Sequence, residues 1–452
     1  MNDLSDRNDL TQGPLAKSLM RLAGPMFVST TLQNAQSVID LFWVGRLGSD
    51  AVAALAVSGT LLMLLFPVVM GLSTGTVAMV ARCVGAGRVN EAAEVGGQSL
   101  VVALVFGLVA GVVGWYSAEW LCRLLGGSEE VVRLGTDYMG ISFLGCFTVF
   151  LLFIGSSILQ ASGNTMVPMQ AMLLSNVLNI GLAPVFIFGL LGVPRMGVRG
   201  AALATVLAQA VAAAMVLRVL VRGSAGVRIQ ACHWWPRRDL VWRLVRIGVP
   251  SSGQMLSRSL MSVVLMRVVA GFGTAAVAAY GIGVRFHMIV LMPAFVLGNA
   301  AATMVGQNLG AGRTDRAERV AWLATGMDVA IMLGSALILM VWAAPLVGLF
   351  DSAPGVVAMG TRYLRVVSLF YVPAAFSIVL GRALQGAGDT MTPMVTTIIG
   401  LWGFQVPLAF ILPHFFTSAT DGIWWSIAVA LTANGLMVAA WFQRGKWKHR
   451  RV

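Results

Sequence analysis

Charged residues are scarce in this 452-residue chain, at 11% of all positions, against about 25% in a typical soluble domain. Hydrophobic residues make up 58%. The runs 51–81, 138–194 and 390–420 contain no Asp, Glu, Lys or Arg, and about 20 apolar residues cross a bilayer as a helix. This composition excludes an ordinary soluble domain and predicts an all-α polytopic membrane protein.

Cysteine and histidine are also few, with four of each. None stands in a CxxC or other metal-ligand spacing, so we predict no metal site and no cofactor. The apolar segments contain no HExxH and no paired catalytic carboxylates, patterns that accompany hydrolytic chemistry. We therefore expect no enzymatic activity.

Acidic residues number 18 against 31 basic ones, a net charge of +13. The basic residues gather at 218–246 and after Trp441, beside apolar runs. The positive-inside rule accounts for such clusters without a nucleic-acid partner. It predicts cytoplasmic N- and C-termini. We expect the membrane to be the cytoplasmic (inner) membrane of a prokaryote. The polar N-terminus, residues 1–24, lacks the pattern of a cleavable signal peptide.

Apolar runs separated by short polar connectors predict twelve transmembrane helices. They are expected near 18–44, 52–81, 93–118, 132–160, 166–190, 198–222, 243–269, 277–308, 319–346, 358–384, 391–416 and 422–443. The long polar connector in the middle divides them into two lobes of six. We predict an N-terminal lobe over 1–222, a cytoplasmic linker over 223–240, and a C-terminal lobe with a basic tail over 241–452.

The two lobes repeat at a constant offset of 225 residues. Gly85-Ala-Gly-Arg matches Gly310-Ala-Gly-Arg, and Gly163-Asn-Thr-Met-Val-Pro-Met matches Gly388-Asp-Thr-Met-Thr-Pro-Met. Six helices is an even number, so both lobes enter the membrane from the same side. This is a parallel repeat, which in transporters accompanies alternating access to a site between the repeats.

The repeated Gly-rich segments are predicted to be turns on the cytoplasmic side, where glycine supplies tight-turn backbone angles. Phosphate binding is not expected at them, because no P-loop lysine follows the glycines. We interpret them as hinge or packing turns.

One carboxylate, Asp40, stands within the first apolar segment. Gln33, Gln36 and Ser37 fall on the same helical face as Asp40. A carboxylate in hydrocarbon costs at least about 2.5–3.5 kcal/mol and usually faces a cavity, where it handles protons or ions. The alternative is that Asp40 lies at the membrane edge and snorkels, or caps a neighbouring helix.

Several motifs together resemble the multidrug and toxic compound extrusion (MATE) family. They are IDLFWVGRLG at the end of the first span, VGAGR, LQASGNTMVPM, the NVLNI run and GQNLGAGRTDRAERV in the second lobe. The resemblance covers about 14–442. It implies two six-helix lobes and an antiporter that exports drug-like, often cationic, organic compounds in exchange for H⁺ or Na⁺. The 225 offset puts Leu265 opposite Asp40, so the chain looks most like the DinF-like branch, whose coupling centres on the first lobe.

The resemblance assigns roles to residues of the first lobe. Asp40 matches the coupling aspartate, with Asn179 and Thr205 as polar groups near it. Pro25 matches a proline at which the first helix bends. Gln33 and Asn176 match pocket-lining positions, and to these we add Gln36 from the polar face and Met172, one turn before Asn176, as substrate-binding candidates.

The branch often carries a second acid where this chain has Ala183. One carboxylate offers a dehydrated sodium ion a poor anionic shell, so protons are favoured as the coupling ion and Na⁺ stays open. Burial also favours the protonated form of a carboxyl group.

Other polar groups in the second lobe leave alternatives open. Asp328 is interpreted as the partner of a nearby arginine or backbone donor, with a transport role as the alternative. Arg258, Arg285 and His287 are expected to pair within the lobe, with a role toward anionic substrates as the alternative. An alternative function is an exporter or flippase of lipid-linked precursors, which needs a cationic cavity. Arg258 and Arg285 are the candidates for such a cavity. A monomer is the default oligomeric state.

Overall fold

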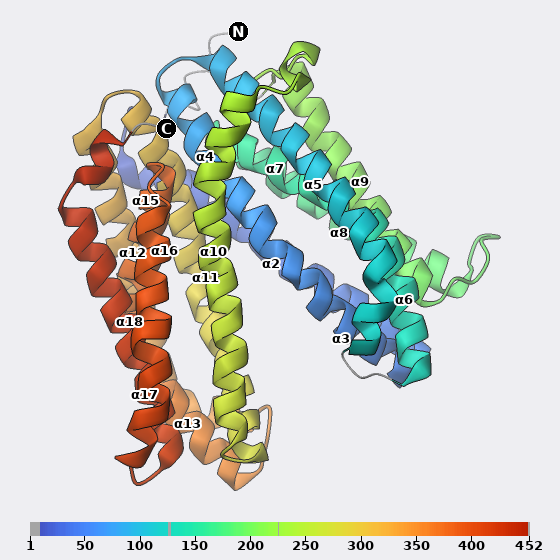
Figure 1. Ribbon diagram of the computed structural model, residues 1–452, viewed down its shortest axis with the longest axis vertical. Coiled ribbons are helices and arrows are strands. Elements are labelled where there is room, and N and C mark those ends of the chain that lie inside the picture. Colours follow the sequence, from blue (N-terminus) through green and yellow to red (C-terminus); the bar gives the residue numbers. More distant parts are fainter. Residues whose placement is uncertain (1–9, 125–127, 225, 451–452) are drawn as a thin grey trace. The chain divides into compact units, whose positions relative to one another are not determined.

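The computed structural model describes residues 10–124, 128–224 and 226–450. Within these residues all regular secondary structure is helical (Figure 1), which confirms the all-α prediction. The predicted polar N-terminus falls partly on residues 1–9, and the basic tail ends at 451–452; both stretches lie outside the described residues.

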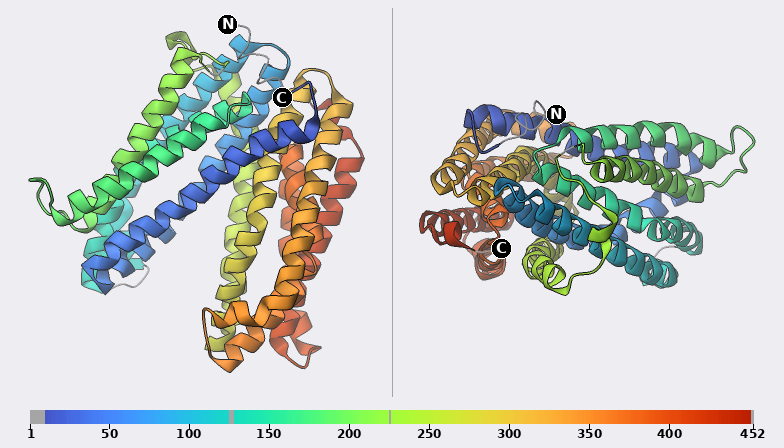
Figure 2. Two further views of the ribbon diagram at one scale, coloured as in Figure 1. Left: turned by 180° about the vertical axis from the view of Figure 1, so that it is seen from behind. Right: turned by 90° about the horizontal axis from the view of Figure 1, so that it is seen from above.

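The chain divides into two compact units. The first comprises Met1–Gln12 and Met20–Val249, and the second comprises Gly13–Leu19 and Pro250–Val452. Two of the three divisions, after Leu19 and after Val249, fall inside long helices, and the third, after Gln12, precedes the first of these helices. Figure 2 shows that the helices of each unit run alongside one another.

The helices of the first unit are long and joined by short turns. They are α2 (Leu15–Val44), η1 (Gly45–Leu47), α3 (Ser49–Leu62), η2 (Met63–Leu65), α4 (Phe66–Gly85), α5 (Val89–Leu124), α6 (Glu129–Leu144), α7 (Cys146–Ala161), α8 (Met166–Phe188), α9 (Val198–Arg222) and η3 (Ala231–Trp234).

The second unit repeats this order with more interrupted helices, and its first helix begins in the first unit and enters the second at Pro250. They are α10 (Arg238–Ala270), α11 (Thr274–Gly310), α12 (Thr314–Gly348), α13 (Pro354–Ser368), α14 (Tyr371–Ala375), η4 (Phe376–Leu380), α15 (Gly381–Gly386), α16 (Met391–Ile398), η5 (Ile399–Gln405), α17 (Val406–Ile411), η6 (Leu412–His414), α18 (Ala419–Gln443) and η7 (Lys446–His449). Both η4 and η5 are π-helical.

Twelve membrane spans account for these helices, as predicted. Eight helical segments are long and apolar enough by themselves, and two bent pairs supply two more. The remaining two are α2 and α10, the first span of each repeat. Both are long enough to cross a bilayer, but polar side chains such as Gln36, Asp40, Gln254 and Arg258 lower their hydropathy.

The internal repeat is visible in the backbone. Glycines with positive φ recur 225 residues apart, as Gly48 and Gly273 (114° and 98°), Gly87 and Gly312 (73° each), and Gly163 and Gly388 (89° and 86°). A left-handed backbone is open to glycine at little cost. The turns also share their hydrogen bonds, since the Asn164 amide donates to the Leu159 carbonyl and the Asp389 amide to the Leu384 carbonyl, each at 2.9 Å.

The fourth and tenth spans are bent, which the sequence pattern did not predict. The α6–α7 pair bends by 47° and the pair from Pro354 to Gly386 bends by 60°. Gly145 marks the first bend, and a Cβ there would lie 2.4 Å from the Val206 side chain of α9. Pro373 follows the second bend and lacks an amide donor for the helix.

The first unit holds the middle linker against α5. The buried Gln98 amide donates to the carbonyls of His233 (2.9 Å) and Trp235 (2.8 Å), and its oxygen accepts from the Arg237 amide at 2.9 Å.

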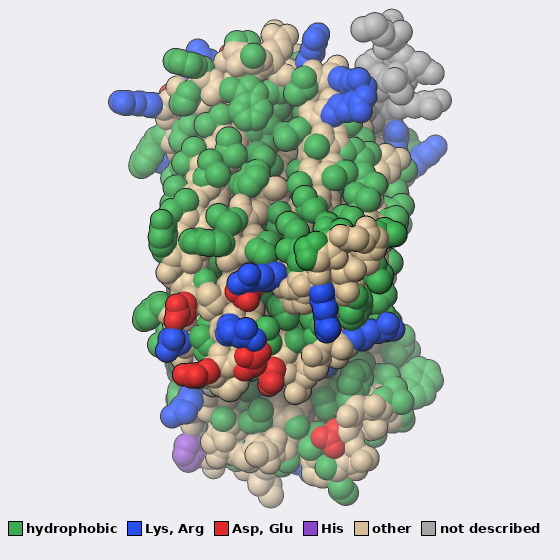
Figure 3. Space-filling view, turned by 90° about the vertical axis from the view of Figure 1, so that its right-hand side faces the viewer, with side chains coloured by type: hydrophobic (Ala, Val, Ile, Leu, Met, Phe, Trp, Pro, Cys, Tyr) green, Lys and Arg blue, Asp and Glu red, His purple; other side chains and the backbone are tan. Residues whose placement is uncertain are grey.

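Apolar side chains cover most of the face drawn in Figure 3, with Lys and Arg near its upper end and mixed charges lower down.

Candidate functional site

Asp40 lies on the last turns of α2 and is half-buried. Its Oδ1 accepts a hydrogen bond from the Asn179 side-chain amide of α8 at 2.9 Å. The Thr205 hydroxyl of α9 lies 3.3 Å from the same oxygen, and the Asn179 amide also donates to the Thr205 Oγ1 at 3.1 Å. Three helices therefore bring together the three residues that the sequence associates with coupling.

The close approach of α8 and α9 places Asn179 beside Thr205. A Cβ on Gly200 would lie 2.5 Å from the carbonyl oxygen of Phe186, so only glycine fits this crossing without movement. Ala201, Ala204 and Ala208 continue the small-residue surface of α9, and all three are buried. Small residues of this kind let membrane helices approach closely.

Asn179 is the most enclosed member of the site, with 0% of its surface exposed. Its amide nitrogen serves Asp40 and Thr205, while its Oδ1 is buried without a hydrogen-bond partner among the described residues. The Thr205 hydroxyl has a second acceptor within reach, the Ala201 carbonyl at 3.1 Å. One hydroxyl proton serves one acceptor at a time, so Thr205 can turn it toward or away from Asp40.

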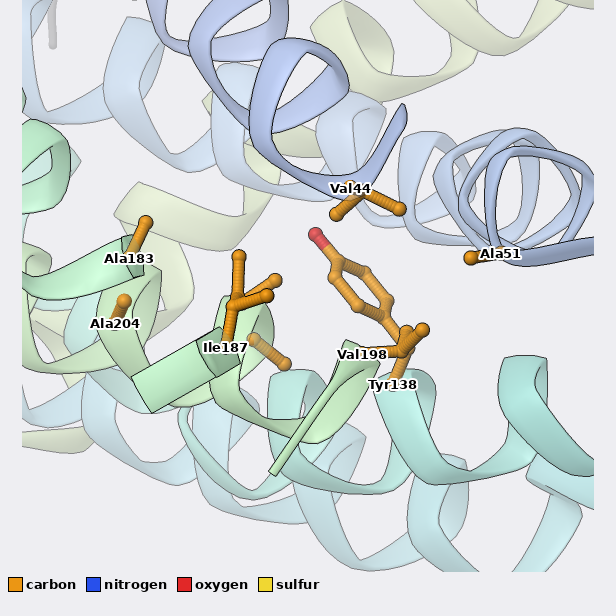
Figure 4. Packing of buried hydrophobic residues seen from close by; sticks show 9 residues of the cluster. Val44, Ala51, Tyr138, Ala183, Ile187, Val198 and Ala204 are labelled. Atoms are coloured by element: carbon orange, nitrogen blue, oxygen red, sulfur yellow. The ribbon is translucent and has the colours of Figure 1, made fainter. Parts of the chain in front are cut away.

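A buried apolar cluster adjoins the end of α2. It contains Val44, Ala51, Tyr138, Ala183, Ile187, Val198, Ala201, Ala202 and Ala204. Tyr138 of α6 points its hydroxyl toward Val44, one turn beyond Asp40 (Figure 4). The sequence analysis did not identify Tyr138. Two features could have indicated it: tyrosine is rare in this chain, with five in all, and Tyr138 stands at the start of a charge-free run.

Ala183, which stands where the resemblance leads one to look for a second acid, is 1% exposed within this apolar cluster. The side chains of Ala183 and Ile187 therefore contribute only hydrocarbon surface. Asp40 has polar partners on one side, from Asn179 and Thr205, and apolar packing beyond them.

The four substrate-binding candidates lie on α2 and α8. Gln36 and Asn176 are buried, while Gln33 and Met172 are half-buried. The Asn176 amide donates to the Met172 carbonyl at 2.9 Å within α8. Among the described residues, the side-chain nitrogen of Gln36 and the Oδ1 of Asn176 have no hydrogen-bond partner. No hydrogen bond joins the α2 pair to the α8 pair within the described chain.

Pro25 lies within α2, which continues unbroken from Leu15 to Val44. Its carbonyl accepts a hydrogen bond from the Ser29 hydroxyl at 2.9 Å. A proline inside a helix removes one amide donor from the ladder and weakens the helix locally.

The expected partner for Asp328 is absent, so that interpretation is wrong. Asp328 of α12 is 0% exposed, and neither carboxylate oxygen has a hydrogen-bond partner among the described residues.

The expected pairing of the second-unit cations is also wrong. Arg258 and His287 form no ion pair among the described residues, and Arg285 is exposed. Instead Arg258 lines a small cavity together with Arg382 of α15, a residue that the sequence analysis did not identify.

Comparison with known proteins agrees with this architecture. The MatE family model matches residues 25–185 and 250–411, so its two copies begin 225 residues apart. The chain is 28% identical to the probable multidrug resistance protein YoeA of Bacillus subtilis, over 96% of this chain and 95% of that protein. It is 25% identical to a probable multidrug resistance protein NorM of Thermotoga maritima, covering 97% and 94%.

A solved structure described as MATE in the bent conformation shares the fold with a TM-score of 0.91, at 26% identity and 98% coverage of both chains. The family model matches well over half of the sequence in two repeats, and the twelve spans follow the same division. The chain therefore belongs to the MatE family, the multidrug and toxic compound extrusion transporters.

Proposed function

We propose that this transporter is a secondary active antiporter that exports drug-like or toxic organic compounds in exchange for protons, with Asp40 as the proton-binding group. The observation that supports it is the convergence of Asn179 and Thr205 on one carboxylate oxygen of Asp40. The relatives named as multidrug resistance proteins support the class of cargo.

Protons are favoured over sodium by the composition around Asp40. Dehydrated metal cations are held by several oxygen ligands, carboxylates and carbonyls among them, and the side chains of Ala183 and Ile187 supply no oxygen. A proton needs a single carboxylate oxygen. The Asn179 and Thr205 donors stabilise the charged carboxylate, and burial favours the neutral one.

The proton acts in this proposal by removing a charge. A charged Asp40 keeps its surroundings hydrated, because a carboxylate without water costs several kcal/mol. Once Asp40 is neutral, α2 can bend near Pro25 and close the cavity on that side. Cargo then loses its binding surface, for which Gln33, Gln36, Met172 and Asn176 are the candidates. Transport requires cargo to bind the two states with different affinity.

Alternating access and the membrane orientation complete the proposal. The parallel repeat supports alternating access. The basic residues that gather at 218–246 and after Trp441 lie beside spans, which supports cytoplasmic termini in a bacterial inner membrane under the positive-inside rule.

The experiment uses purified protein in liposomes loaded with ethidium, with a pH gradient and a sodium gradient imposed separately. We expect dye movement driven by the pH gradient and none driven by sodium alone. Movement driven by sodium alone would reject the proton as coupling ion. Loss of both would reject the antiport proposal for this cargo.

A further inference from the structure

The second unit contains a small cavity of about 20 Å³, enough for about one water-sized polar group. Four elements of the second unit build its wall, namely α10, α11, the π-helical η4 and α15. The lining residues are Gln254, Met255, Arg258, Phe295, Ser377, Ile378, Gly381, Arg382 and Gln385. The cavity thus accepts the end of a molecule, with apolar surface from Met255, Phe295 and Ile378 beside it.

Two cations face this cavity without a counter-charge. Arg258 and Arg382 are both half-buried, and neither forms an ion pair among the described residues. The lining contains no Asp or Glu. Two guanidinium groups around one enclosed space repel each other, and an anion between them would relieve that cost.

A hydrogen-bond chain fixes Arg382. Its Nη1 donates to the Gln385 oxygen at 3.1 Å, the Gln385 amide donates to the Gln254 oxygen at 2.8 Å, and the Gln254 amide donates to the Thr397 hydroxyl at 2.8 Å. The side-chain oxygens of Gln254 and Gln385 both accept hydrogen bonds from this series of contacts. Among the described residues one of the five N–H donors of Arg382 is occupied, so the cavity presents mainly donors.

Two further contacts complete a donor-rich wall. The Arg382 guanidinium lies 5.7 Å from the centroid of the Phe295 ring, which restrains its plane. The Ser377 hydroxyl accepts from the Asn434 amide at 2.8 Å, which leaves its own proton to donate. Ser377 belongs to the π-helical segment, and such segments are frequent at functional sites.

The internal repeat shows that these cations are specific to the second unit. The 225 offset places Arg258 opposite Gln33 and Arg382 opposite Ser157. Ser157 is neutral and lies 2.6 Å from the Ser73 hydroxyl. Among the described residues, α2 of the first unit carries the carboxylate of Asp40, whereas the equivalent span of the second unit, α10, carries Arg258.

We propose that the Arg258–Arg382 cavity binds a carboxylate or phosphate group, so that the compounds handled by this transporter include organic anions or zwitterions. The inference deepens the proposed export function by naming a cargo class. Guanidinium groups recognise both anions through paired N–H donors, so the group can come from an organic molecule or from free phosphate.

The test measures binding to purified protein in phosphate-free buffer by fluorescence anisotropy. Fluorescein carries the anionic group, and rhodamine 123 is a cation on the same ring scaffold. The variants are Arg258→Gln and Arg382→Gln, and the matched control is Arg285→Gln on the exposed face of α11. We expect fluorescein affinity to fall at least tenfold in the first two variants and to stay unchanged in the control.

Rhodamine 123 binding reports that each variant is folded and is expected to change less than twofold. Equal fluorescein affinity in wild type, Arg258→Gln and Arg382→Gln would overturn the proposal. If inorganic phosphate displaces fluorescein from the wild-type protein, the site is assigned to a free or bound phosphate group. If fluorescein binding depends on the two arginines but phosphate does not displace it, the site is assigned to organic carboxylates.

Transport separates this inference from the proposed function. Proton-driven rhodamine 123 efflux in liposomes tests the antiporter and does not require the anion site. If efflux is normal and fluorescein binding is unchanged by substitution of either Arg258 or Arg382, the anion site alone would be rejected. Absent efflux with arginine-dependent fluorescein binding would reject the antiporter and leave the anion site standing.

Discussion

Asn179 donates a hydrogen bond from α8 to the Asp40 carboxylate of α2 across 2.9 Å, between residues 139 positions apart in the sequence. Asn179 also donates to Thr205 of α9 at 3.1 Å. A single enclosed amide therefore links the one carboxylate of α2 to the α8–α9 hairpin. This relationship makes Asn179 a positioning residue for Asp40, and it can be tested separately from Asp40 itself.

Asn179→Ala is expected to reduce proton-driven efflux about 10- to 100-fold, because a hydrogen bond to a charged acceptor contributes about 1.5–3 kcal/mol. The measurement is dye efflux from liposomes under a fixed pH gradient. Asn34→Ala on the exposed part of α2 is the control and should transport normally. An Asn179→Ala protein with wild-type rates would show that Asp40 does not depend on this contact.

Thr205→Val should weaken coupling, whereas Thr205→Ser should retain it, because serine keeps the hydroxyl that faces Asp40 at 3.3 Å. Valine preserves the side-chain shape and removes the donor. We expect the valine variant to change the pH profile of efflux with little change in the apparent affinity for dye. Identical pH profiles in the two variants would contradict a role for the hydroxyl.

Gly200→Ala tests the helix crossing that aligns the site. The added Cβ would lie 2.5 Å from the Phe186 carbonyl oxygen, and overpacking of this kind costs about 1–3 kcal/mol. The thermal midpoint of the detergent-solubilised protein should fall by several degrees. The control is Gly59→Ala in α3, where a Cβ meets nothing within 4 Å and the midpoint should hold or rise. Equal midpoints in both variants would contradict the crowded crossing.

Asp328→Asn should leave the thermal midpoint unchanged or raise it, because Asp328 is buried without a hydrogen-bond partner among the described residues and the amide carries no charge. Asp389→Asn is the contrasting case. The Asp389 carboxylate accepts from the Thr392 hydroxyl at 2.7 Å and lies 3.5 Å from Arg450, so its loss should cost about 1–3 kcal/mol. A larger loss at Asp328 than at Asp389 would show that Asp328 has a structural partner.

The span count and the repeat were predictable because they depend on local composition. Charge-free runs locate the helices, and the recurrence of Gly87 as Gly312 and of Gly163 as Gly388 follows from turns that only glycine enters easily. The convergence of Asn179 and Thr205 on Asp40 was predicted through the family resemblance. The residues alone indicated Asp40, because one carboxylate in an apolar helix is conspicuous.

The remaining features depend on contacts that hydropathy does not encode. Gly145, at the bend between α6 and α7, lies close to Val206 of another helix, where a Cβ would clash. Arg382 joins Arg258 across 124 positions, and a single arginine in an apolar run does not indicate which neighbour it meets. The same reason explains Asp328: sequence shows a buried acid but not whether a donor reaches it.

The central claim is that Asp40 couples cargo export to protons, and one comparison tests it most directly. Wild-type protein and Asp40→Asn are placed in liposomes, and ethidium movement is followed both down its own gradient and against it under an imposed pH gradient. The account predicts that Asp40→Asn keeps downhill exchange and loses uphill transport. Uphill, pH-driven transport by Asp40→Asn at the wild-type rate would contradict it.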